Sequence, residues 1–114
     1  RTVAVFGCGG DRDKTKRPRM GKAAADWSDF AVVTTDNPRT EEPAAIIRDI
    51  LPGLSGPHLV IPDRREAIFR ALDLARPGDT VILCGKGHET TQETGGHRLP
   101  MDERQIIAEY INGS

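Results

Sequence analysis

TVAVFGCGGDRD, from Thr2 to Asp13, is the stretch that decides the fold of this 114-residue chain. Its first part, Thr2–Phe6, is a short run of apolar and β-branched residues, which is typical of a buried strand. Gly7 ends the run and opens a glycine-rich turn, GCGGDRD. The segment therefore predicts a strand that delivers a polar, glycine-rich turn at its carboxyl end.

The rest of the chain alternates between strand-like and helix-like segments. Further strands are expected at Phe30–Thr35, His58–Ile61 and Thr80–Cys84. Helices are expected between and after them: over about Met20–Trp27, after Thr40, after Asp63 and after Asp102. This alternation predicts an α/β fold, a Rossmann-like open and mostly parallel sheet with helices on both faces. The order of the strands does not follow from it.

Helix caps and apolar faces can also be read from the pattern. Thr40 is expected to cap the second helix, and Asp63 and Asp102 stand three residues before Glu66 and Gln105, the spacing of a capping box. The inward residues are expected to be Ala44, Ile47, Ile50 and Leu51 in the second helix, Ala67, Ile68, Ala71, Leu72 and Ala75 in the third, and Ile106, Ile107, Tyr110 and Ile111 in the last. The polar segment 90–100 is expected to be a loop or a weak hairpin.

Length and composition indicate one soluble domain over residues 1–114. The hydrophobic content is 37%, and the formal charge is −1, which does not favour a nucleic-acid partner. No apolar run approaches the roughly 18 residues of a membrane span, so the expected location is the cytoplasm. Cys8 and Cys84 lack the spacing of a metal site. They are interpreted as small buried residues in a reducing compartment, where a disulfide is improbable even if they lie close together.

Three turns at the carboxyl ends of expected strands carry unusual residues. They are GCGGDRD after the first strand, DNPR (36–39) after the second and GKGHE (85–89) after the fourth. Each combines charged side chains with glycine or proline. Ligands bind at the carboxyl ends of strands in open parallel sheets, so the convergence of these turns predicts a ligand site.

The motifs disfavour a classical nucleotide cradle. Arg12 stands where a dinucleotide-binding G-x-G-x-x-G would have its third glycine, and no P-loop motif occurs in the sequence. The segment 11–22 holds six basic and two acidic residues. Its basic side chains either help to hold phosphates supplied from elsewhere or belong to a solvated loop.

The side chains of the other two turns allow several roles. The Arg39 guanidinium suits paired hydrogen bonds to a carboxylate, and Asp36 and Asn37 can bind an ammonium group or merely close the turn. His88 with Glu89 can transfer protons or bind a metal, but Glu89 serves equally well as a cation binder. No metal site is expected in this chain.

GCGGDRDKTKRPRMG, DNPR and KGHE, in this order and spacing, resemble the C-terminal domain of the Mur ligases. The resemblance spans essentially all of the chain, including PDRREAI at 62–68. DNPR is similar to the tetrapeptide of the members that add meso-diaminopimelate to UDP-N-acetylmuramoyl-L-alanyl-D-glutamate in peptidoglycan synthesis. One departure is Thr15, which stands where many relatives have glycine.

The resemblance implies a three-domain, ATP-dependent amide ligase of which this chain is the amino-acid-adding domain. The missing domains would hold the UDP-MurNAc-dipeptide, ATP and Mg²⁺, so the chain alone is expected to be inactive and to contain no catalytic residue. The meso-diaminopimelate contacts implied are Arg12, Asp36, Asn37, Arg39, Gly85 and Glu89, with Pro38 shaping the turn. Asp11, Lys16 and Arg17 are implied to lie near the nucleotide, the latter two with less support. His88 is assigned to shaping its turn.

Two other classes of function are compatible with the same motifs. One is a stand-alone small-molecule binding module that uses the same pocket. It would be distinguished from the ligase by an open reading frame without an upstream P-loop. The other, which the missing third glycine disfavours, is a fragment of a nucleotide-binding oxidoreductase. It predicts a change in cofactor fluorescence on titration with NAD(P)H, and no such change is expected.

Overall fold

Strand β1 (Thr2–Phe6) is an inner strand of a four-stranded parallel sheet with the order β3-β2-β1-β4. It pairs with β2 (Phe30–Val33) on one side and with β4 (Thr80–Leu83) on the other, and β3 (His58–Val60) forms the far edge beside β2. This computed structural model describes residues 1–10, 14–84, 91–94, 97–100 and 102–112. Within them the expected class, an α/β fold with a parallel sheet, is confirmed.

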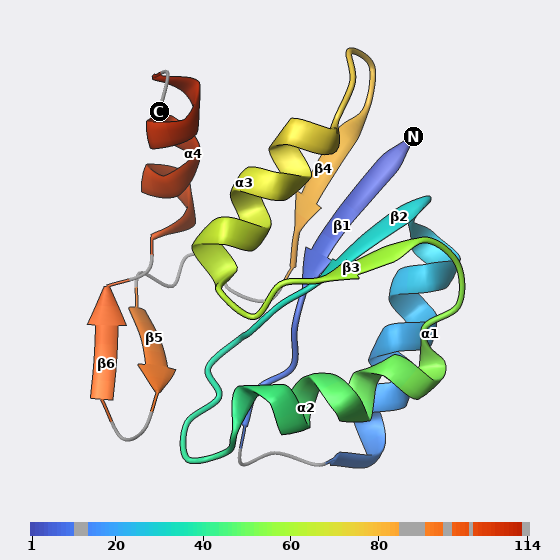
Figure 1. Cartoon of the computed structure of the whole chain (residues 1–114), viewed down its shortest axis with the longest axis vertical. Coiled ribbons are helices and arrows are strands. Elements are labelled where there is room, and N and C mark those ends of the chain that lie inside the picture. The colour runs from blue at the N-terminus through green and yellow to red at the C-terminus, as the bar shows by residue number, and fades with distance from the viewer. Residues whose placement is uncertain (11–13, 85–90, 95–96, 101, 113–114) are drawn as a thin grey trace.

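Helices cover both faces of the sheet (Figure 1). The helical elements are η1 (Lys14–Lys16), α1 (Arg17–Trp27), α2 (Pro43–Ile50), η2 (Leu51–Gly53), α3 (Arg64–Leu74) and α4 (Glu103–Ile111). α1 and α2 lie on one face and α3 on the other, with α4 packed outside α3. β5 (Thr91–Thr94) and β6 (His97–Pro100) form a separate antiparallel hairpin, which confirms the hairpin reading of segment 90–100.

Alternation along the inner strands divides the core in two. Successive side chains of a strand point to opposite faces, so Val3 and Val5 contact one cluster and Phe6 the other. The first cluster consists of Val3, Val5, Val32, Ala67, Ile68, Ala71 and Ile106, and the second of Phe6, Ala31, Val33, Ile46, Ile47 and Ile50. Burial on both faces explains why TVAVF has no polar position between Val3 and Phe6.

Two of the three expected helix caps are confirmed. The Asp63 carboxylate accepts hydrogen bonds from the backbone N–H groups of Arg65 and Glu66, and Asp102 accepts one from Arg104. The prediction that Thr40 caps the second helix was wrong. α2 begins at Pro43, and its N-cap residue, Glu42, makes no side-chain hydrogen bond to the helix N-terminus. The chain is still in the preceding turn at position 40, because the Glu41 N–H donates to the Pro38 carbonyl at 3.0 Å.

Several boundaries and faces also differ from the expectation. α1 begins at Arg17 rather than near Met20, because Pro18 is well suited to a first helical turn, where its missing N–H costs nothing. Strands β2, β3 and β4 end one or two residues early. In α2 Ile46 is buried and Ala44 is exposed. Ile111 is 73% exposed, since it lies in the last turn of α4, beyond the part that packs on α3.

The core assignment predicts how two isoleucines differ. Ile68 is fully buried, so Ile68→Ala should lower the free energy of unfolding by about 2–5 kcal/mol. Ile111→Ala should change it by less than about 0.5 kcal/mol, because that side chain is already in water. Urea denaturation of both variants measures the difference. A large loss for Ile111→Ala would contradict the placement of the end of α4.

Candidate functional site

The carboxyl ends of β1, β2 and β4 lie together at one edge of the sheet. The chain passes from β1 to β2 and β3 on one side and then returns to β4 on the other side of β1. The strand order therefore reverses between β1 and β4. The crevice at the carboxyl ends of these two strands is the topological switch point, where open α/β sheets bind ligands. The observed strand order thus makes the three turns singled out in the sequence begin next to one another.

The first and second turns are in direct contact. The Gly10 N–H donates to the Asn37 carbonyl at 2.8 Å, and the Arg39 Nη1 donates to the Gly10 carbonyl at 3.0 Å and to the Asn37 carbonyl at 3.3 Å. Pro38 is buried beneath them. A Cβ atom on Gly10 would stand 1.7 Å from the Pro38 carbonyl oxygen. The glycine therefore permits a close approach that no other residue allows.

The DNPR turn has an unusual backbone. Asn37 has a φ of 38° and Arg39 a φ of 53°, and these are the non-glycine residues with positive φ in the described part of the chain. Asn tolerates the left-handed region, but Arg seldom adopts it, and such conformations cost of the order of 1–3 kcal/mol each. Strain of this kind persists where the surroundings hold it, and it is concentrated at functional sites.

The buried side chain of Arg17 connects the first turn with the segment that follows the DNPR turn. Its Nη1 donates to Glu41 Oε2 at 3.0 Å and to Asp49 Oδ2 at 2.8 Å, while its Nη2 donates to Glu41 Oε1 at 2.8 Å and to the Gly9 carbonyl at 3.2 Å. The side chain is 1% exposed. Hydrogen bonding to Glu41 raises the pKa of Arg17 above its already high value. Arg17 therefore ties the first turn to α2.

The other residues singled out in the sequence are placed as follows. Asp36 and Arg39 are half-buried at the carboxyl end of β2, and Lys16 is exposed at the end of η1. The burial of Arg17 gives it a structural part in the domain, and its proximity to a nucleotide, like that of Lys16, stays a prediction. Asp11, Arg12, Gly85, His88 and Glu89 lie outside the described residues.

The two cysteines lie just beyond β1 and β4 and contact the same apolar cluster. Both are free thiols in the structure. Burial raises the pKa of the Cys8 thiol to about 11, an effect that nearby Arg17 opposes and the negative charge of Asp36 reinforces. Burial likewise raises the pKa of Cys84. Both thiols are therefore protonated and unreactive near neutral pH.

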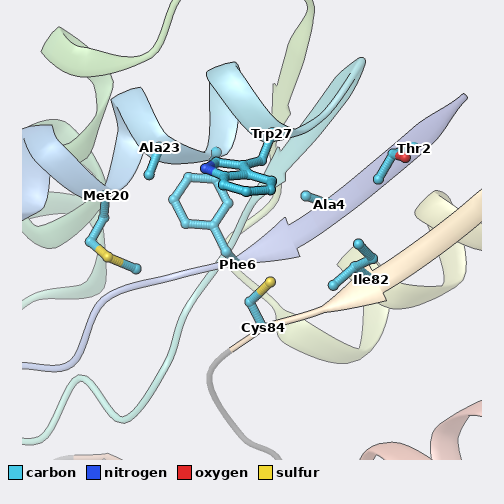
Figure 2. A pocket seen from close by; sticks show the side chains of 9 residues that line it. Thr2, Ala4, Phe6, Met20, Ala23, Trp27, Ile82 and Cys84 are labelled. Carbon is cyan, nitrogen blue, oxygen red and sulfur yellow. The ribbon is translucent and has the colours of Figure 1, made fainter.

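An apolar pocket lies on the face of the sheet beside α1 (Figure 2). It has a volume of about 200 Å³, and Phe6, Trp27, Ile82 and Cys84 are among the residues that line it. Such a lining offers no partner for a charged small molecule. Among the described residues no group of three or more His, Cys, Asp and Glu side chains is placed to hold a metal ion, and no helix is long and apolar enough to cross a membrane.

Sequence reasoning missed the buried roles of two arginines, Arg17 and Arg64. Both are the first residue of a helix, α1 and α3 respectively, and both are 1% exposed. A cation at a helix N-terminus is opposed by the helix dipole. This unfavourable placement is the signal in the sequence that something else holds these side chains.

The chain is an α/β domain whose polar turns follow the strands at the switch point, the position where open sheets bind ligands. Residues 1–87 match the family model described as the Mur ligase, glutamate ligase domain. The chain belongs to that family, which confirms the resemblance noted in the sequence.

Relatives and a solved structure agree with this assignment. The chain is 52% identical over 117 residues to the UDP-N-acetylmuramoyl-L-alanyl-D-glutamate–2,6-diaminopimelate ligase of Syntrophomonas wolfei, covering 99% of the chain and 24% of the relative. It is 50% identical over 113 residues to the ligase of the same name from Aquifex aeolicus, covering 97% of the chain and 23% of the relative. A solved structure of a ligase with this name aligns with a TM-score of 0.94 and 43% identity, over 98% of the chain and 24% of the structure. The chain thus spans about a quarter of the length of these proteins.

The contact between the first two turns can be tested at Gly10. Gly10→Ala should displace the DNPR turn and lower the free energy of unfolding by about 1–3 kcal/mol, because the new methyl group collides with the Pro38 carbonyl. Gly56 has a φ of 92° and open space around it, so Gly56→Ala is a control that strains the backbone elsewhere. Amide NMR should show shifts at residues 36, 37 and 39 for Gly10→Ala only, and shifts at those residues in both variants would contradict the contact.

The raised thiol pKa values predict slow alkylation. At pH 8 a thiol with a pKa of about 11 is roughly 0.1% thiolate, so Cys8 should react with iodoacetamide about a hundredfold more slowly than a free cysteine. The rate should rise with pH for as long as the chain stays folded. Peptide mass spectrometry measures it, and the urea-unfolded chain serves as the fast control. Equal rates in the two states would show that burial does not protect the thiol.

Proposed function

We propose that this chain is the amino-acid-binding domain of an ATP-dependent carbon–nitrogen ligase that adds meso-diaminopimelate to UDP-MurNAc-L-Ala-D-Glu. The ligase would act in the cytoplasm, in the synthesis of peptidoglycan. The observation that carries the proposal is the DNPR turn, strained and held against the first turn at the switch point. The names of relatives that are about half identical to this chain support the choice of amino acid.

The chemistry of the turn suits this ligand. Meso-diaminopimelate differs from lysine by a second carboxylate at its far end. When lysine binds, a guanidinium that would pair with that carboxylate is left without its charged hydrogen-bonded partner. The loss of this pair disfavours lysine far more strongly than a difference in apolar fit would. In this proposal Arg39 binds the distal carboxylate together with Arg12, while Asp36 and Glu89 balance the ammonium groups. Asn37 and Gly85 contribute further contacts, and Pro38 holds the shape of the turn.

The Arg39 guanidinium is held in place by the domain itself. Its Nη1 atom donates to the carbonyls of Gly10 and Asn37, so the guanidinium is anchored from the protein side before any ligand arrives. An anchored side chain loses little conformational entropy on binding. The Arg39 guanidinium would thus already be in position when the ligand binds, and the ligand would not have to order it.

ATP, Mg²⁺ and the UDP-sugar dipeptide are assigned to other parts of the ligase. The whole sequence lacks a P-loop, and the described residues hold no metal-ligating cluster. Asp11, Lys16 and Arg17 would lie at the side facing the nucleotide. The task of this domain would be to bring the amine of the bound amino acid to the activated carboxylate, which requires the domains to close on one another. Alone, the chain would bind the amino acid without joining it to anything.

The selectivity can be measured on the chain itself. By isothermal titration calorimetry, meso-diaminopimelate should bind at least about tenfold more tightly than L-lysine, because lysine leaves Arg39 without its carboxylate. Arg39→Ala should abolish this preference, and Arg39→Lys, which keeps the charge without the planar fork, should retain only part of it. Arg48→Ala, at an exposed arginine of α2, is the matched control and should leave both affinities unchanged.

The titration separates the proposal from its rivals. Equal affinity of the wild-type chain for the two amino acids would contradict the role of Arg39, and binding of neither would contradict amino-acid binding by this domain. Amide NMR spectra of each variant establish that the fold is retained, so that a lost preference is not mistaken for unfolding.

A further inference from the structure

Arg64 is a buried cation at the carboxyl edge of the sheet. It is the first residue of α3, which the Asp63 carboxylate caps. Its side chain is fully buried, although the next residue of the helix, Arg65, is half-exposed. An arginine is buried so completely only where its donors have partners, so the partners show what it does.

The guanidinium of Arg64 joins three separate segments. Nη1 donates to the Thr35 carbonyl at 3.1 Å, Nη2 donates to the Cys84 carbonyl at 2.8 Å, and Nε donates to Glu103 Oε2 at 2.8 Å. The carboxylate of Glu103, in the first turn of α4, is only 7% exposed and balances the charge. We use the name Arg64 clamp for this side chain with its two backbone carbonyl contacts.

The two carbonyls belong to strands that are not neighbours. β1 lies between β2 and β4, so their axes are about 10 Å apart and no ladder hydrogen bond joins them. Thr35 and Cys84 also lie beyond the last residues of their strands, Val33 and Leu83. A single planar guanidinium therefore joins directly two strand ends that the sheet connects only through β1.

These two carbonyls stand next to the proposed amino-acid site. Thr35 immediately precedes Asp36 and the DNPR turn, and Cys84 immediately precedes the turn at 85–89. A second contact from the same segment holds this end of β2, because the Thr35 hydroxyl donates to the Pro62 carbonyl at 2.6 Å. The segment from Pro62 to Arg64 thus makes two hydrogen bonds to Thr35, the residue just before the DNPR turn.

We propose that Arg64 is a positioning residue that sets the spacing between the backbones of Thr35 and Cys84, the residues that immediately precede two of the turns proposed to contact the amino acid. This inference rests on the proposed function for its ligand, but the clamp itself can be tested without one. Arg64 touches no substrate in this proposal. It acts through the backbone, and it needs the fork of a guanidinium, because the ammonium group of lysine cannot reach three acceptors in this arrangement.

The experiment compares three variants of the chain. Arg64→Lys keeps the charge and loses the fork, whereas Glu103→Gln disturbs the buried ion pair and leaves the two carbonyl contacts in place. Arg65→Lys is the matched control, because Arg65 also joins α3 to α4, through Glu109, and lies over the Phe69 ring. Amide hydrogen exchange at residues 35–37 and 39 is measured without ligand, and the affinity for meso-diaminopimelate is measured with it.

The clamp predicts a specific pattern. Arg64→Lys should accelerate exchange at residues 35–37 and 39 relative to the core amides of β1 and should weaken meso-diaminopimelate binding by about tenfold or more. Glu103→Gln should weaken it by no more than about threefold, because both carbonyl contacts remain, and Arg65→Lys should not change it. If Arg64→Lys does not fold, Glu103→Gln decides: it keeps both carbonyl contacts, so local exchange at residues 35–37 and 39 should stay unchanged relative to the core amides of β1, and a selective acceleration there would overturn the clamp.

The possible results separate the clamp from the proposed function. If the wild-type chain binds no diaminopimelate, the proposed function fails, and the exchange data alone decide on the clamp. If the wild-type chain binds but Arg64→Lys binds equally well with unchanged local exchange, the clamp is overturned. A merely structural role is indicated if Arg64→Lys and Glu103→Gln lose affinity and global stability in parallel, and that result also overturns the clamp.

Discussion

The parallel pairing of β1 with β2 and β4 is the constraint on which the rest of the structure depends. It buries TVAVF on both faces, which divides the core into two apolar clusters. It also points all strand ends in one direction, so that polar turns from distant parts of the chain meet at a single edge. The apolar pairing of the strands and the placement of the polar site are thus consequences of the same hydrogen-bonded ladder.

Beyond the ends of the ladder, backbone hydrogen bonds between turns and buried arginine side chains replace strand pairing as the source of order. The Gly10–Asn37 hydrogen bond and the contacts of Arg64 with Thr35 and Cys84 lie close to the strand ends, and Arg17 reaches the Gly9 carbonyl from the start of α1. Removing one partner of a buried ion pair costs about 3–5 kcal/mol, whereas an apolar replacement of the whole pair is often neutral. These buried ion pairs are therefore better explained by the positions in which they hold the turns than by a gain in the stability of the domain.

Much of the fold followed from local pattern, because local physics decides it. The apolar runs predicted the strands, and the carboxylates of Asp63 and Asp102 predicted two helix starts. The strand order and the burial of Arg17 and Arg64 depend on contacts between segments far apart in the chain, which periodicity does not record. Of the proposed ligand-binding residues, the structure shows those of the DNPR turn beside the first turn. It also shows the left-handed backbone of Arg39, which the letters DNPR did not reveal.

The contacts that Arg64 makes with the strand ends have an evolutionary consequence. Both acceptors are backbone carbonyls, which every amino acid possesses, so the grip does not depend on which side chains follow Thr35 or Cys84. Mutation can therefore exchange the residues of the neighbouring turns while the scaffold beneath them keeps its shape. A domain built in this way can acquire a new amino-acid preference through a few substitutions without having to reinvent its fold.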